Sequence, residues 1–82
     1  MLMQQVIENL RELAASVPPE ERGQLRAEIE KWIAIRTTDL ANAVSNRDGA
    51  VTPKYKSLWS RWVESIQRQI QELKQLLDSL DR

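Results

Sequence analysis

Apolar residues recur at spacings of three and four along most of the chain, which is the period of an amphipathic helix. The first segment with this period spans about residues 2–16 and stops before Pro18 and Pro19. Pro18 disfavours a helical conformation in the residue before it, whereas Pro19 suits the first turn of a new helix. No segment shows the strict alternation expected of a strand. The pattern therefore predicts an all-α fold.

The second periodic segment runs from about residue 19 to residue 46. Two features weaken it. Gly23 costs about 1 kcal/mol relative to alanine in a helix interior. Thr38 is followed by an acid and could cap a restarted helix. Both a continuous helix and one kinked near Gly23 or Thr38 are compatible with the sequence.

A loop of about residues 47–52 separates this segment from the third one. Asp48 and Gly49 supply turn chemistry, and Thr52 stands where it can cap a helix whose first residue is Pro53. The third helix should span about residues 53–80. Its three-four spacing persists over three heptads and is the most regular pattern in the chain.

Two helices of nearly equal length joined by a short loop fold back as an antiparallel hairpin. We therefore expect residues 1–82 to form one helical domain, a short N-terminal helix followed by a long hairpin. The first helix is long enough to cover only part of the hairpin groove. The remainder requires a second chain, so we expect a homodimer that forms a helical bundle.

The composition supports association and argues against catalysis. A chain of 82 residues buries only about 60–65% of its unfolded surface, so its core is marginal without a supplement. With no Cys and no His, the chain has neither disulfides nor the usual zinc ligands nor the usual general base. We expect no enzyme, no cofactor and no metal site, and oligomerisation remains as the supplement.

The charges are balanced, with twelve Lys and Arg against twelve Asp and Glu. No overall field therefore attracts this chain to polyanions. No apolar run is long enough to span a membrane, and Glu8, Arg11 and Glu12 interrupt the stretch in which a signal peptide would be uniformly apolar. We expect a cytoplasmic protein that does not bind membranes.

The segment TPKYKSLWSRW, residues 52–62, contains three aromatic and three basic side chains and no acid. On a helix, Tyr55, Trp59 and Trp62 share one face. Lys54 and Arg61 lie on a different face, and Arg68 continues their line at heptad spacing. Single-strand nucleic-acid binding requires rings and cations in the same groove, so this separation argues against it. The tryptophans fit either a core or an interface.

Arg36 lies on the apolar line between Trp32 and Leu40. A guanidinium buried there without a partner would be costly. Its stem could cover apolar surface while the charge reaches solvent. Alternatively, it could pair with a carboxylate on the facing helix or on a second chain.

These patterns predict a non-catalytic protein–protein interaction module, such as an adaptor, assembly factor, inhibitor or regulator, that acts as a homodimeric helical bundle. The predicted dimer or partner interface consists of Trp32, Arg36, Tyr55, Trp59, Trp62, Ile66, Ile70, Leu73 and Leu77. The alternative is a small regulator that binds DNA or RNA through paired basic faces. That face would consist of Lys54, Arg61 and Arg68.

Overall fold

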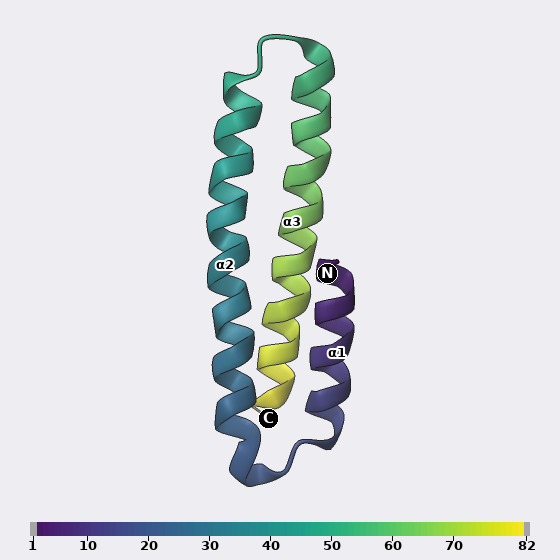
Figure 1. Cartoon of the computed structure of the whole chain (residues 1–82), viewed down its shortest axis with the longest axis vertical. Helices are drawn as coiled ribbons and strands as arrows, with labels where there is room; N and C mark the ends of the chain where they lie inside the picture. Colours follow the sequence, from purple (N-terminus) through teal and green to yellow (C-terminus); the bar gives the residue numbers. More distant parts are fainter. Residues whose placement is uncertain (1, 82) are drawn as a thin grey trace.

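The computed structural model describes residues 2–81 and is all-α, as predicted. Figure 1 shows a short helix α1 (Met3–Ser16) packed beside a long hairpin of α2 (Arg22–Gly49) and α3 (Pro53–Leu80). A single 3-10 turn, Pro19–Glu21, leads into α2. The molecule is a narrow rod with extents of 51 × 21 × 17 Å.

Helix α2 is continuous from end to end. Thr38 does not cap a restarted helix; its hydroxyl instead donates a hydrogen bond to the Ala34 carbonyl one turn earlier, as the Thr37 hydroxyl does to Ile33. Gly23 lies in the first turn of α2, where a glycine interrupts few helical contacts. The helix runs to Gly49, three residues beyond its predicted end, so the connection to α3 is shorter than predicted.

The start of α3 follows the predicted capping pattern. The Thr52 hydroxyl accepts a hydrogen bond of 3.4 Å from the backbone N–H of Tyr55, and Pro53 occupies the first turn. Proline has no N–H to leave unpaired at that position. The cap fixes where α3 begins and so sets the register of its aromatic residues.

The hairpin has two halves with different cores. The base half, α2 residues 22–35 and α3 residues 70–80, shares a three-helix core with α1. The buried members of this core are Val6, Ile7, Leu10, Leu25, Ile29, Leu73, Leu76 and Leu80. The tip half consists of α2 residues 36–49 and α3 residues 53–69. Its core is thinner and is formed by α2 and α3 alone, with Ile70 of α3 at its lower edge. Its buried members are Ala43, Val63, Ile66 and Ile70.

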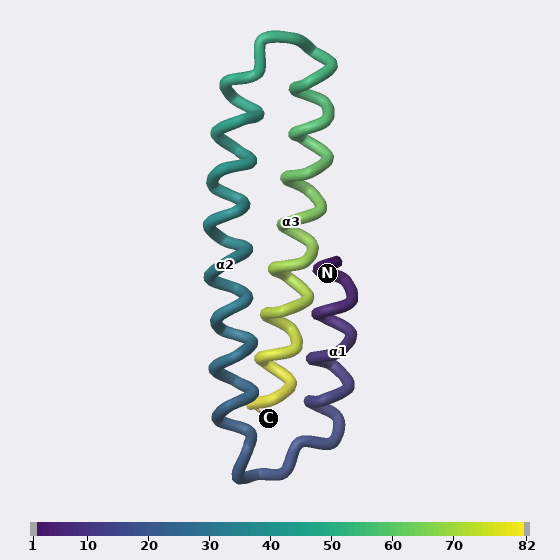
Figure 2. Tube along the Cα trace, in the orientation of Figure 1, coloured from purple at the N-terminus to yellow at the C-terminus, as the bar shows by residue number. Residues whose placement is uncertain are grey.

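Helix α1 explains this difference, because it reaches only half-way along the hairpin. It has 14 residues against the 28 of α3, or about 21 Å against about 42 Å at 1.5 Å per residue. The traces in Figures 1 and 2 place its N-terminal end near mid-height of the hairpin and its C-terminal end near the base, a little below the end of α3. Among the described residues, the tip half therefore has no third helix.

No helix within residues 2–81 is both long enough and apolar enough to cross a lipid bilayer.

Candidate interaction surface

A groove between α2 and α3 continues beyond the first residues of α1 into the tip half. Its section next to α1 is a hollow of about 500 Å³, and two shallower hollows that share Trp62 extend it toward the tip. We call this surface the open groove. Its lining residues in the hairpin are Trp32, Ile35, Arg36, Asp39, Asn42, Ala43, Asn46, Tyr55, Leu58, Trp59, Trp62, Ser65 and Gln69.

The α3 wall of the open groove is apolar and exposed. Tyr55, Leu58 and Trp62 keep 57%, 49% and 54% of their surface accessible to solvent. Trp59 is different, because it is partly buried and packs against the core of the tip half. The two adjacent tryptophans, which the sequence could not distinguish, therefore differ. Trp59 belongs mainly to the core, and Trp62 lies on the surface.

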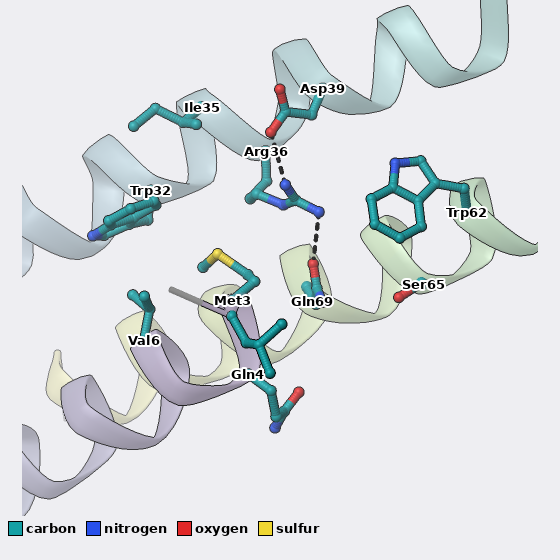
Figure 3. A pocket seen from close by; sticks show the side chains of 11 residues that line it. Met3, Gln4, Val6, Trp32, Ile35, Arg36, Asp39, Trp62, Ser65 and Gln69 are labelled. Carbon is teal, nitrogen blue, oxygen red and sulfur yellow. Dashed lines mark hydrogen bonds and ion pairs between the residues drawn. The ribbon is translucent and has the colours of Figure 1, made fainter. Parts of the chain in front are cut away.

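The α2 wall carries most of the polar side chains of the open groove, and Arg36 lies at their centre (Figure 3). The Arg36 guanidinium donates 2.8 Å hydrogen bonds to Asp39 one turn along α2 and to the side-chain oxygen of Gln69 on α3. Only 16% of its side chain is exposed. Arg36 therefore neither extends to the solvent nor pairs with a carboxylate on the facing helix; its carboxylate comes from its own helix, and the facing helix supplies an amide.

One hydrogen-bond donor of the Arg36 guanidinium has no acceptor among the described residues. It is the Nε atom, which is buried. A buried donor without an acceptor is unfavourable. The open groove thus has an apolar wall on α3 and, on α2, a cation whose hydrogen bonding is incomplete.

Trp32 lies at the boundary between the two halves. Its ring packs against the base-half core, and its indole N–H donates a 3.2 Å hydrogen bond to Glu28. Lys31 donates to the same Glu28 oxygen at 2.9 Å and lies 5.7 Å from the Trp32 ring centroid. The Lys31 hydrogen bond lowers the pKa of Glu28 below its ordinary value of 4.5, with a further contribution from Trp32. These contacts hold Trp32 against its own helix.

Four residues of the predicted interface are packed within the chain itself. Ile66 and Leu73 are completely buried and Ile70 is 8% exposed. Leu77 is partly buried against the base-half core. These side chains contribute to the intrachain core, so the predicted residues that remain accessible in the tip half are Tyr55 and Trp62.

The surface also contains apolar residues that the sequence analysis did not select. Leu58 and Ile35 line the open groove. Leu2 and Val51, at the start of α1 and in the α2–α3 loop, are 80% and 96% exposed. Leu58 lies four residues before Trp62 and therefore on the same helical face, so the sequence alone could have identified it. Leu2, Ile35 and Val51 carried no such signal, because their exposure depends on how the three helices pack.

The basic face predicted on α3 is exposed to solvent. Lys54, Arg61 and Arg68 all lie on the outside of the helix. None of them forms an ion pair with another residue in the range 2–81. Their charges are therefore not neutralised within the chain.

A comparison with protein-family models, curated proteins and solved structures found no match to this chain.

Proposed function

We propose that this protein is a non-catalytic protein–protein interaction module and that it acts as a homodimer through the open groove. The observation that carries the proposal is the exposure of Trp62, in a groove whose other half is filled by α1. In the base half, α1 covers the hairpin and buries eight core side chains with it. In the tip half, the groove continues, but none of the described residues 2–81 covers it.

The thin core of the tip half supports the same proposal. Two packed helices bury only the stripe along which they touch, and four buried residues form that stripe here. A domain of this size is marginally stable unless more apolar surface is covered. Exposed Trp and Tyr are also the residues most enriched at the energetic centres of protein interfaces. A second chain on the open groove would supply the missing layer.

Sedimentation equilibrium over a wide concentration range tests the proposal. The chain has a mass of 9.5 kDa, and we expect a concentration-dependent shift to twice that mass. Leu58→Ala should weaken the dimer. Leu13→Ala is a matched control, because Leu13 is also an exposed leucine, at 57% against 49%, but lies on α1 outside the open groove.

We expect the Leu58 variant to dissociate at least tenfold more readily than the wild-type chain and the Leu13 variant to behave as wild type. Both substitutions shorten a solvent-exposed side chain, so neither should prevent folding; circular dichroism verifies this. A wild-type chain that stays monomeric at all concentrations contradicts the proposal. So does an equal effect of the two substitutions.

One observation favours a second candidate function, the binding of DNA or RNA. Lys54, Arg61 and Arg68 form a line of exposed cations that have no ion-pair partner within residues 2–81. Three phosphate contacts per chain give a log-log salt slope of only about −2.7, or about −5 for a dimer. This electrostatic contribution is weak, and the net charge of zero adds nothing to it, so protein–protein interaction is the better supported function.

A further inference from the structure

We propose that the open groove is covered by the open groove of a second copy, with the two hairpin tips pointing in opposite directions and only the tip halves overlapping. This inference rests on the homodimer proposed above and specifies its geometry. Each tip would then end against the start of the other copy's α1. The assembled rod would have a four-helix centre and a three-helix bundle at each end.

The position of α1 excludes the other face-to-face arrangement. If both tips pointed the same way, the two base halves would also face each other, each covered by its own α1. Two helices, each about 10 Å across, would then separate the base halves while nothing separated the tip halves. Two straight hairpins cannot satisfy both spacings. With opposed tips, each tip half occupies the same layer as the other copy's α1, end to end with it.

The lengths agree with this arrangement. The uncovered part of α2, from Arg36 to Gly49, is 14 residues long, or about 21 Å. A second tip half placed there ends beside Leu2, and by symmetry this chain's tip ends beside the Leu2 of the second copy. Leu2 and Val51 are the two most exposed large apolar residues among those described. With opposed tips, Leu2 of each copy lies beside Val51 of the other copy. A short helix from another protein would not bring these two residues together.

The register also makes the groove complementary to itself. On α3 the overlap from Pro53 to Gln69 has its midpoint at residue 61, so Trp62 lies close to the two-fold axis, where it can pack against its own copy. Paired aromatic rings at the centre of a buried patch are the usual anchors of an interface.

On α2 the same symmetry matches polar groups. Arg36 comes to the level of the second copy's Gly49, the C-terminal end of its α2. Carbonyls at a helix C-terminus carry partial negative charge and lack helical partners. The Nε atom of Arg36, which has no partner among the described residues, therefore lies at the level of these carbonyl acceptors. Asp39 and Asn46, which both line the groove, also reach the same level in opposite chains and can form a hydrogen bond.

The exposed apolar surface is sufficient for a stable dimer. Six large apolar side chains of the open groove and its two ends are between 41% and 96% exposed: Leu2, Ile35, Val51, Tyr55, Leu58 and Trp62. They amount to about 600 Å² per chain if an aromatic side chain contributes about 150–250 Å² in full and an aliphatic one somewhat less. If all of this area were covered, two chains would bury about 1,200 Å² of apolar surface alone, which reaches the lower end of the range of specific interfaces.

Cross-linking between single cysteines tests the geometry. The natural chain contains no cysteine, so Leu2→Cys and Val51→Cys each introduce one thiol at an exposed site. The two variants are mixed in equal amounts at a concentration where sedimentation shows dimer and are then oxidised. Mass spectrometry identifies which chains are joined. Leu13→Cys mixed with Val51→Cys is the control, because Leu13 is exposed on the same helix but lies about 16 Å further from its start.

We expect efficient cross-linking of Leu2→Cys to Val51→Cys, and only background from either variant alone or from the Leu13 control. Cross-linking of Val51→Cys to itself would place the tips together and overturn the opposed arrangement. A dimer by mass in which the Leu2 and Val51 thiols do not join would overturn it as well, while leaving the homodimer intact. A chain that is monomeric by sedimentation would overturn both proposals.

Discussion

Replacement of Trp62 by alanine is the most informative single change in this protein. Trp62 is 54% exposed and lines all three hollows of the open groove. In the proposed dimer it lies near the two-fold axis, so each dimer loses two indoles at its centre. We expect Trp62→Ala to weaken dimerisation strongly.

The size of the effect follows from the exposed area. An exposed fraction of 54% corresponds to about 130 Å² if a full Trp side chain offers about 250 Å². At about 25 cal/mol per Å², covering all of it contributes about 3 kcal/mol per chain and about 6 kcal/mol per dimer, as an upper bound. If only a third is covered, about 2 kcal/mol remains, which corresponds to an increase of about 30-fold in the dissociation constant.

Sedimentation equilibrium measures this dissociation constant directly, and circular dichroism at the same concentrations verifies that the variant is helical. Leu13→Ala provides the control for removal of exposed apolar surface outside the groove. A dissociation constant for Trp62→Ala within about threefold of the wild-type value, less than 1 kcal/mol, would refute the reasoning. It would show that this indole is not covered on association.

Trp59→Ala should behave differently, because Trp59 packs against the core of the tip half. Its loss removes intrachain contacts, so we expect a lower free energy of unfolding in a monomeric background such as Trp62→Ala. Urea unfolding followed by circular dichroism measures this. If Trp59→Ala left that stability unchanged, its assignment to the core would be wrong.

Three further outcomes follow from the structure. Ile66→Ala should lower the free energy of unfolding by about 3 kcal/mol in urea titrations, because Ile66 is completely buried. Glu28→Gln should destabilise the chain at neutral pH, since the hydrogen bond from Lys31 lowers the pKa of Glu28. That contribution is complete above the ordinary value of 4.5 and is lost as the pH falls through the lowered pKa, so wild type and variant should converge in acid; a constant difference would contradict this. Lys54→Glu combined with Arg61→Glu should leave helicity unchanged, and salt-sensitive retention on DNA or RNA that this change abolishes would favour the nucleic-acid function.

Much of the fold could be predicted because it is encoded locally. The apolar period gave three helices, Pro18 and Pro19 marked the break after α1, and Thr52 marked the cap of α3. Each of these signals acts over a single helical turn. The predicted end of α2 was three residues too early, because Asp48 and Gly49, which are typical of turns, belong to its last helical turn.

The partners of Arg36 could not be predicted. The sequence placed a charge on an apolar line. The expected extension to solvent and the expected carboxylate on the facing helix were both wrong, because the guanidinium donates to Asp39 on its own helix and to Gln69. An ion pair with a carboxylate of a second chain stays a prediction. The Gln69 contact joins residues 33 positions apart in the chain. It depends on how α2 and α3 are rotated against each other, and helical periodicity within one segment does not specify that rotation.

The sequence by itself determined the helices, their caps and the antiparallel hairpin, because periodicity, prolines and a short loop act between residues that are near neighbours in the chain. Only the tertiary structure separated Trp59 in the core from Trp62 on the surface. Both tryptophans lie on one helical face. What distinguishes them is their angle to α2, because Trp59 packs against the core between α2 and α3 and Trp62 does not. Helix α1 covers neither of them, since it reaches only the middle of the hairpin. Exposure is a property of the packed neighbours, and the packing of α1 ends before it reaches Trp62.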